Sequence, residues 1–214
     1  MVGIEALPLG RHQIHEAGEA LGRAFFDNPA FLWVIPDDAK RERVLPWLLG
    51  TGVRYGNLFG EVHTTPGKAE GTAVWLPPGS TDMTLWRMIR TGFLAALLKL
   101  GLAELSRFYN ANNYLDKLHE RDMPGTHWFL MILGVDPARQ GQGVGRALIR
   151  PVLAHADADG LPCYLETSKE RNLRFYQSHG FEILREIDIP NGGPRTLDDA
   201  AEAGRRRRRL IARA

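Results

Sequence analysis

The chain has 214 residues, of which 44% are hydrophobic and 24% are charged, so it can bury a full hydrophobic core and is neither disordered nor fibrous. Its formal net charge is +2, but this balance turns negative without the five arginines at 205–209, so a basic surface for nucleic acid is not expected on the folded part. The single cysteine, Cys163, excludes an internal disulfide and a cysteine-rich zinc site and is typical of a cytoplasmic protein.

Two helices and a hairpin are predicted in the first third of the chain. Residues 11–26 and 38–55 carry apolar side chains at helical spacing, which indicates amphipathic helices. Residues 61–65 and 72–76 have the pattern of short strands and are separated by a segment that contains a Pro-Gly turn signal. The pattern therefore predicts two helices followed by a β-hairpin.

Residues 80–120 favour helix and are rich in leucine, with Gly92 and Gly101 as the expected breaks between two or three helices. The segment is longer than a connection between neighbouring strands requires, so we expect it to be an insertion that builds specificity for the acceptor. Its most apolar stretch, residues 92–98, is far shorter than the roughly 20 residues that cross a bilayer. No membrane partner is expected.

From residue 126 the pattern is that of a βαβ unit followed by another helix and strand. The predicted elements are a strand at 128–135, a helix at 143–159, a strand at 161–167, a helix at 170–179 and a strand at 181–189. They complete a predicted α/β domain of residues 1–194. An atypical charged tail, residues 195–214, follows the domain and is not expected to contribute a strand.

A glycine-rich turn lies between the predicted strand 128–135 and the helix that follows. Gly141, Gly143 and Gly145 lack side chains, so backbone N–H groups can converge there on phosphate oxygens at the positive end of the helix dipole. Arg139 and Arg146 add positive charge at the rim. The turn therefore predicts a site for a phosphate-bearing ligand.

Two common phosphate sites fit this turn poorly. A P-loop needs a lysine followed by serine or threonine, and no lysine follows the glycines. A dinucleotide site of the Rossmann type needs a third glycine where Arg146 stands, and it occurs early in a doubly wound sheet, whereas this turn comes late in the chain. A nucleoside triphosphate and a dinucleotide are both disfavoured.

The segment Q-G-Q-G-V-G at 140–145 resembles the Q/R-x-x-G-x-G/A pyrophosphate loop of the GNAT superfamily of acetyltransferases. A second segment, N-L-R-F-Y-Q-S-H-G-F at 172–181, resembles the N-x-x-x-x-Y-x-x-x-G-F helix of the same family and follows at the expected distance. Residues 24–29, 73–79 and 165–168 are similar to the branch that contains puromycin N-acetyltransferase. The resemblance covers roughly residues 4–194.

The resemblance implies a mixed, mostly antiparallel sheet flanked by helices, with acetyl-CoA as cosubstrate and the amine of a small molecule as acceptor. It implies that the backbone of Leu133 and Val135 binds the pantetheine arm and that Asn172 faces the cofactor. The residues expected to hold the pyrophosphate are Arg139, Gln140, Gly141, Gln142, Gly143, Val144, Gly145 and Arg146. No metal is implied, and the seven histidines lack the spacing of a metal site.

Two residues are candidates for proton transfer. The family assigns a tyrosine at the position of Tyr176, and a phenol with a pKa near ~10 is protonated at neutral pH, so it can protonate the departing thiolate. The alternative is that Tyr176 only packs beside Phe175 and Phe181. Glu166, at the end of a predicted strand, is a candidate base for the acceptor ammonium, although a carboxylate that caps or pairs at the rim of the sheet has the same pattern.

Three functions remain open at this level. The first is direct acetyl transfer to an amine in a ternary complex, and the second is a non-catalytic acyl-CoA-binding regulatory module. The third, binding of nucleic acid through the terminal arginines, has no support in the folded region. The acceptor amine is not identified, and a homodimer is compatible with the sequence.

The tail departs from the family, whose members usually finish with a strand containing W-x-M-x-R. One choice of codons for residues 196–202 gives R-W-M-M-R-R when read one base out of frame, so we expect that the tail arises from a frameshift. Loss of that strand would expose an edge of the sheet. Sequencing of the gene tests this hypothesis.

Overall fold

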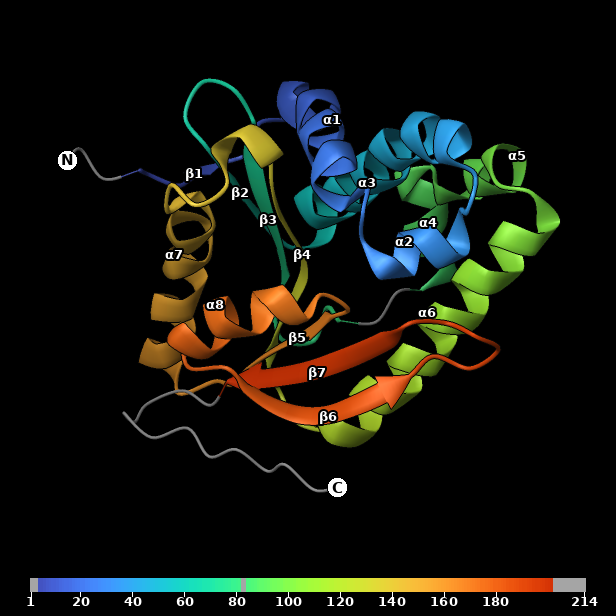
Figure 1. Cartoon of the computed structure of the whole chain (residues 1–214). Helices are drawn as coiled ribbons and strands as arrows, with labels where there is room; N and C mark the ends of the chain where they lie inside the picture. The colour runs from blue at the N-terminus through green and yellow to red at the C-terminus, as the bar shows by residue number, and fades with distance from the viewer. Residues whose placement is uncertain (1–3, 82–83, 202–214) are drawn as a thin grey trace.

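Seven strands form a single sheet in the computed structural model, which describes residues 4–81 and 84–201. The strands are β1 (Leu7–Pro8), β2 (Glu61–Thr64), β3 (Gly71–Leu76), β4 (Trp128–Val135), β5 (Cys163–Thr167), β6 (Glu182–Asp188) and β7 (Arg195–Ala201). Their order across the sheet is β1-β2-β3-β4-β5-β7-β6, and only β4 and β5 pair in parallel. The predicted mixed, mostly antiparallel sheet is confirmed (Figure 1).

Helices cover both faces of the sheet. They are α1 (Ile14–Phe25), α2 (Pro29–Val34), α3 (Asp38–Phe59), α4 (Leu85–Thr91), α5 (Ala96–Lys99), α6 (Leu102–Asp122), α7 (Val144–Asp159) and α8 (Leu173–Ser178). Short 3-10 turns lie at Arg11–Gln13, Phe93–Ala95, Pro137–Arg139 and Glu170–Asn172. The sequence did not predict α2, which begins directly after Asn28, where the side-chain oxygen accepts a hydrogen bond from the Ala30 N–H.

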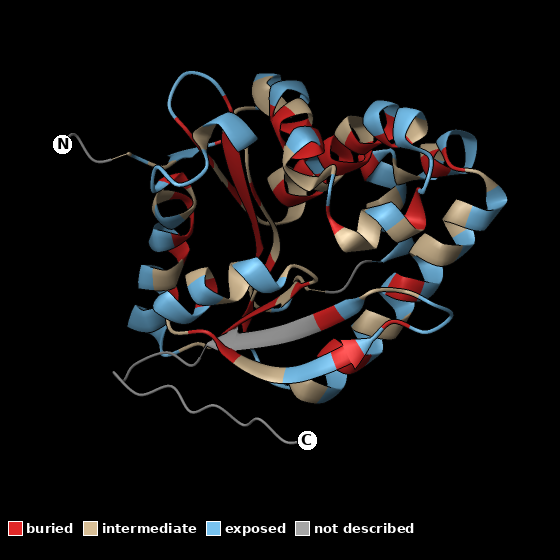
Figure 2. Ribbon diagram, viewed as in Figure 1, coloured by how far each residue is buried: buried red, intermediate tan, exposed pale blue. Residues whose placement is uncertain are grey.

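The hydrophobic core has one layer on each side of the sheet. Buried side chains of α7, among them Leu148 and Val152, pack with β4, β5 and Tyr176 of α8. Leu21 of α1 and Leu48 of α3 pack on the opposite face against β2 and β3. The buried positions in Figure 2 follow the inward faces of these helices. The two layers meet at the sheet and fix the places of α1, α7 and α8 around β4.

Glycines let α1 approach its neighbours closely. A Cβ added to Gly18 would lie 2.5 Å from the Pro46 carbonyl oxygen of α3, and one added to Gly22 would lie 2.7 Å from the Pro46 ring. A Cβ at Gly134 of β4 would lie 2.5 Å from Leu21 of α1. Such contacts are impossible for a larger residue, so these glycines allow the end of α1 to reach β4.

Strands β4 and β5 separate part-way along their length. Their parallel pairing ends at Leu130 and Leu165, although β4 continues to Val135. Across the other edge of β4, the register with β3 passes from Leu130 to Ile132 and leaves Met131 unpaired, which is the pattern of a β-bulge. The far half of β4 therefore has an edge that β5 does not cover.

The structure contradicts the predicted domain boundary at 194. Residues Arg195–Ala201 form β7, which pairs on one side with β5 and on the other with β6. The prediction that this strand is missing is wrong because main-chain N–H and C=O groups pair whatever the side chains are. Thr196 is buried, and Arg195 forms an ion pair with Glu186 of β6. The arginine run at 205–209 lies outside the described residues.

The predicted insertion is helical, with breaks where the sequence places them. Gly92 ends α4 at a φ of 83°, and Gly101 precedes α6. Helix α6 crosses the sheet on the side away from α7 and α8 (Figure 1). None of the helices that the structure describes is long and apolar enough to span a membrane.

Candidate active site

A cavity of about 530 Å³ collects most of the residues that the sequence analysis singled out. The end of α1 lines one side, and the starts of α7 and α8 line the other, which is possible because β4 and β5 diverge there. The predicted residues that line it are Leu133, Val135, Arg139, Gln140, Gly141, Gly143, Val144, Gly145, Arg146, Asn172 and Tyr176. The volume is usual for a small-molecule site.

The glycine loop leaves the first turn of α7 without a cap. Gly141 and Gly143 have φ values of 74° and 82°, and a Cβ at either position would meet no atom within 4 Å, so the space beside them is open. Gly143 is the N-cap residue of α7 and offers no side-chain hydrogen bond. The first N–H groups of a helix lack partners within it. The first N–H groups of α7 can therefore donate to an anion in the cavity, and the helix dipole adds a favourable interaction with its charge.

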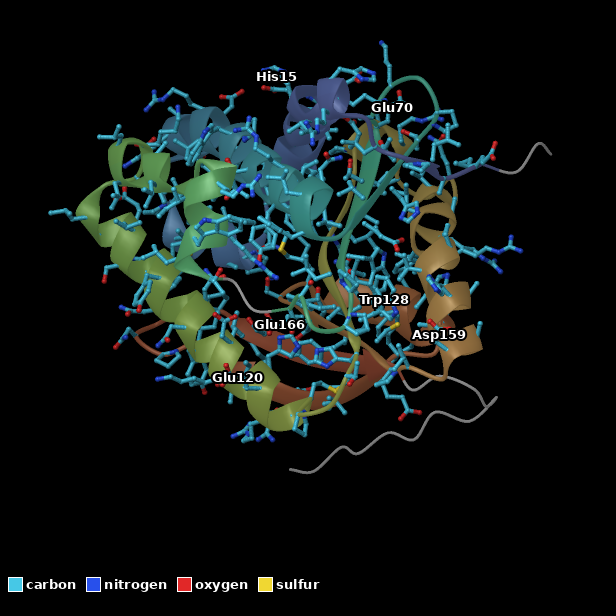
Figure 3. All side chains as sticks on the ribbon, turned by 180° about the vertical axis from the view of Figure 1, so that it is seen from behind. His15, Glu70, Glu120, Trp128, Asp159 and Glu166 are labelled. Carbon is cyan, nitrogen blue, oxygen red and sulfur yellow. The ribbon has the colours of Figure 1, made fainter. Side chains whose placement is uncertain are left out.

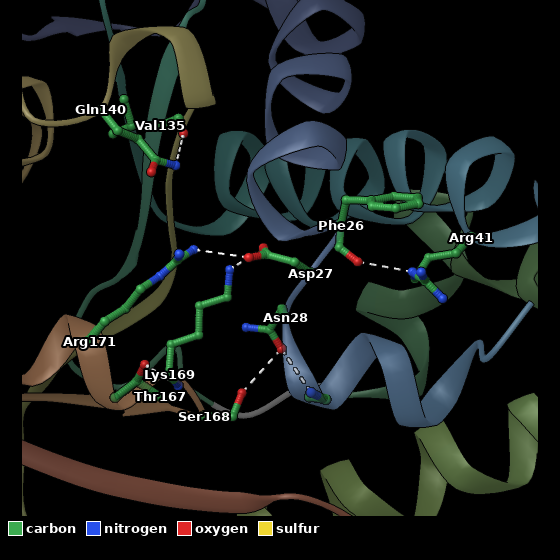
Figure 4. Close-up of polar contacts among 11 residues, drawn as sticks. Phe26, Asp27, Asn28, Arg41, Val135, Gln140, Thr167, Ser168, Lys169 and Arg171 are labelled. Carbon is green, nitrogen blue, oxygen red and sulfur yellow. Dashed lines mark hydrogen bonds and ion pairs between the residues drawn. The ribbon is translucent and has the colours of Figure 1, made fainter. Parts of the chain in front are cut away.

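The uncovered edge of β4 supplies further backbone groups. The Asp136 N–H donates to the Glu70 carbonyl oxygen, at 2.8 Å, on the β3 side. Because main-chain groups alternate along a strand, those of Val135 and Leu133 point to the other side, where the cavity lies. The Gln140 side chain donates to the Val135 carbonyl oxygen at 2.9 Å (Figure 4). Among the residues that the structure describes, no strand pairs with this edge at Leu133 and Val135, so the N–H of Val135 and both groups of Leu133 can bind a ligand.

Positive charge surrounds the cavity. Arg139, Arg146, Lys169 and Arg171 line it, and no aspartate or glutamate is among the described residues that do. Lys169 and Arg171 form ion pairs with Asp27, which follows α1 (Figure 4). The hydrogen bond from Lys169 lowers the pKa of Asp27, so this partner stays charged at neutral pH. Arg139 pairs with Glu70 at 3.0 Å, so among the described cations that line the cavity Arg146 is the one without a carboxylate partner and is available to an anionic ligand.

Tyr176 of α8 lines the cavity. It is 6% exposed and packs edge to face against Phe175 and Phe181, with ring centroids 5.2 and 5.8 Å away. The packing that the sequence analysis offered as an alternative role is thus present, and Tyr176 lines the cavity as well. The aromatic neighbours hold the ring in place while the cavity gives a ligand access to it.

Glu166 and Gln142 do not line this cavity. Gln142 donates to the Ala138 carbonyl oxygen at 3.0 Å within the loop. Glu166 accepts a hydrogen bond of 3.0 Å from the Tyr164 hydroxyl, on the face of the sheet that α6 covers (Figure 3). It follows Leu165, the last residue of β5 that pairs with β4, so it stands where the two strands separate.

A pair of buried histidines, His119 and His127, packs beside the ring of Tyr164. The Tyr164 ring stacks on His119 of α6, with centroids 4.1 Å apart, and His119 Nε2 lies 2.7 Å from Nε2 of His127. His127 Nδ1 lies 2.7 Å from the Gly125 carbonyl oxygen and must carry a hydrogen there. Burial, and next the proximity of His127, lower the pKa of His119 to about 4. Both histidines line a second, polar cavity of about 500 Å³.

Several cavity residues had no recognised role in the sequence analysis. Ala24 and Phe25 end α1 and Asn28 lies in the loop that follows it, a segment that the pattern identified only as a helix and its stop. Lys169 and Arg171 follow β5, and two cations directly after a buried strand were the available signal for them.

Comparison with known proteins agrees with this geometry. Residues 98–183 match a family model described as an acetyltransferase (GNAT) domain. A solved structure from Corynebacterium glutamicum, described as a histone acetyltransferase and related acetyltransferase, covers 96% of this chain and 100% of its own with a TM-score of 0.66 at 22% identity. The chain has the GNAT acetyltransferase fold.

Two further similar proteins are named N-acetyltransferases. A Schizosaccharomyces pombe protein named an uncharacterized N-acetyltransferase is 28% identical over 179 residues, which are 80% of this chain and 72% of that protein. The polyamine N-acetyltransferase of Drosophila melanogaster covers 94% of this chain and 100% of its own, with a TM-score of 0.59 at 11% identity. The matched GNAT segment includes the glycine loop and Tyr176 but excludes α1 and Asn28.

Proposed function

We propose that the protein transfers the acetyl group of acetyl-CoA to the amine of a small molecule. The observation that carries the proposal is the meeting, in one cationic cavity, of the uncapped start of α7, the open edge of β4 and the hydroxyl-bearing ring of Tyr176. The start of α7 suits a pyrophosphate, the edge of β4 suits a pantetheine arm, and Tyr176 suits a departing thiolate. The GNAT fold supports the same assignment, as does the name of the polyamine N-acetyltransferase.

The proposed roles follow the bonds that change. Glu166 takes a proton from the acceptor ammonium, and the neutral amine forms a bond to the thioester carbon while the carbonyl electrons move to oxygen. When that oxygen re-forms the double bond, the carbon–sulfur bond breaks and the nitrogen loses its second proton to water. Tyr176 protonates the thiolate, so the products are an acetamide and coenzyme A.

The two substrates are proposed to approach from different sides. The glycine loop and Tyr176 lie on the side of α7 and α8, whereas Glu166 lies on the face that α6 covers. The divergence of β4 and β5 supports this arrangement, because Glu166 stands at the point where the strands separate. The acceptor therefore meets the thioester from the face opposite to the one at which the phosphates bind.

A turnover screen tests the proposal. Acetyl-CoA is incubated with a panel of polyamines, arylalkylamines, amino acids and aminoglycosides, and the released thiol is measured. Acetyl-CoA-dependent thiol release with at least one amine, and an acetamide of matching mass, is the expected result. Tight acetyl-CoA binding without turnover over the whole panel would favour the non-catalytic acyl-CoA-binding module instead.

Three further assignments belong to this proposal. Membership of the puromycin N-acetyltransferase branch rests on residues 24–29, 73–79 and 165–168 of the sequence. A cytoplasmic location is supported by the single cysteine, which is a buried free thiol. A homodimer is tested by light scattering of the purified chain, where twice the 23.9 kDa of one chain is expected.

A further inference from the structure

The loop between α1 and α2 holds an asparagine whose orientation is fixed. Asn28 Oδ1 accepts hydrogen bonds from the Ala30 N–H at 2.9 Å and from the Ser168 hydroxyl at 3.1 Å (Figure 4). Because a backbone N–H can only donate, the atom that faces Ala30 must be the amide oxygen. The amide nitrogen is therefore the atom on the other side.

Within residues 4–81 and 84–201, that nitrogen has no hydrogen-bond partner. Asn28 is 8% exposed, and no described residue accepts a hydrogen bond from its Nδ2. The residue nevertheless lines the main cavity, and its nitrogen points away from α2 on the side where Lys169 lies (Figure 4). The nitrogen is not among the described polar atoms that are shut off from solvent without a partner, so it reaches the cavity, where an accepting ligand atom can take the place of water.

The surroundings select the kind of ligand atom. Lys169 and Arg171 line the same part of the cavity, but both are paired with Asp27, so their charge is largely balanced and the partly negative oxygen of a neutral carbonyl suits this wall. Asn28 lies apart from Gln140 of the glycine loop and adjoins the residues that follow β5 (Figure 4). The pyrophosphate, held at the loop, is thus not the partner.

We infer that Asn28 Nδ2 donates a hydrogen bond to the acyl carbonyl oxygen of the acyl-CoA in this cavity. The inference rests on the proposed acetyl transfer. When the amine adds to the thioester carbon, the carbonyl electrons move to that oxygen, and the donor stabilises the negative charge that develops. As the carbon–sulfur bond breaks, the electron pair on that oxygen re-forms the C=O bond and the negative charge leaves with the thiolate. Ser168 and Ala30 hold the amide so that it need not reorient during the reaction.

The matched variant is Asn28→Asp. Aspartate keeps the oxygen that caps α2 and accepts from Ser168, and it replaces the N–H donor by an oxygen of almost the same size. We expect an unchanged melting temperature. Binding of acetyl-CoA and of CoA is measured by calorimetry. Both ligands carry the same phosphates, so the effect of the added negative charge on phosphate binding cancels in the ratio of the two affinities. We expect the wild type to prefer acetyl-CoA and Asn28→Asp to lose roughly 10-fold of that preference.

Two further proteins complete the experiment. Asp37→Asn makes the converse exchange at the N-cap of α3, outside both cavities, and is expected to leave the ratio of affinities unchanged. If Asn28→Asp melts at a lower temperature, Asn28→Ser keeps a capping oxygen without the amide and is used in its place. In steady-state turnover with an amine from the screen, kcat is expected to fall roughly 10²-fold.

The outcomes separate this inference from the proposed function. A wild-type ratio of affinities together with a normal kcat in Asn28→Asp overturns the role of Asn28 and leaves the acetyl transfer intact. A raised KM for the amine alone overturns it as well, because the amide would then bind the acceptor. Failure of the wild type to bind either CoA species contradicts the proposed function itself.

Discussion

The Tyr164 hydroxyl donates a 3.0 Å hydrogen bond to Oε1 of Glu166, and the tyrosine that donates it is completely buried. Its ring is held by the stack on His119, and His119 is held by His127. The hydrogen bond from Tyr164 holds the carboxyl group of Glu166 in one orientation, which a group that accepts a proton from an ammonium ion requires.

Tyr164→Phe tests this relationship, because it removes only the hydroxyl. With the donor gone, the carboxylate of Glu166 is no longer held in place, so its proton transfer should slow. We expect kcat/KM for the amine to fall roughly 10-fold, with the melting temperature and the acetyl-CoA affinity unchanged. Turnover at the wild-type rate would show that Tyr164 does not position Glu166.

Tyr176→Phe tests the proposed acid. The ring and its contacts with Phe175 and Phe181 are kept, so folding should be normal. We expect kcat to fall roughly 10²-fold while the affinity for acetyl-CoA stays within about twofold. Turnover at the wild-type rate would assign Tyr176 to packing alone.

Gly141→Ala tests the phosphate loop, with Gly67→Ala as its control. Both glycines have a φ of 74°, and a Cβ at either one meets no atom within 4 Å, so the strain of the substitution is matched. Gly67 lies outside both cavities. We expect both variants to lose about 1 kcal/mol of stability, and only Gly141→Ala to weaken acetyl-CoA binding. Calorimetry with CoA measures the difference, and equal affinities would reject the loop as the phosphate site.

The buried histidine pair predicts a pH-dependent stability. The pKa of His119 is lowered to about 4 from an ordinary 6.5, so below pH 6.5 the unfolded chain binds a proton that the folded chain does not. Stability is therefore complete above pH 6.5 and decreases by roughly 3 kcal/mol as the pH falls to 4. Denaturant unfolding at intervals of half a pH unit measures this loss.

His119→Phe is the matching variant. Phenylalanine keeps a ring to stack on Tyr164 and does not titrate, although it loses the hydrogen bond to His127. The variant should be less stable at pH 7 but should lose less stability between pH 6.5 and 4. Asp27, whose pKa is lowered from 3.8, stays ionised over this interval and does not obscure it. A slope as steep as that of the wild type would assign the titration to other groups.

The local pattern of the sequence determined the elements and much of the site. The apolar strand at 128–135, the glycine turn and the tyrosine of α8 all have the positions that the spacing predicts, because each depends on interactions between residues close in the chain. The family resemblance then placed eleven separate residues that line the same cavity.

Only the tertiary structure decided the rest. Asn28 and Ser168 are 140 residues apart, and their hydrogen bond depends on how α1 packs against β4. The face on which Glu166 lies depends on strand alternation in β5 and on the separation of β5 from β4. The place of β7 between β5 and β6 depends on main-chain pairing, which is nearly indifferent to the side chains from which a sequence pattern is read. Such contacts between distant residues leave no periodic signal in the chain.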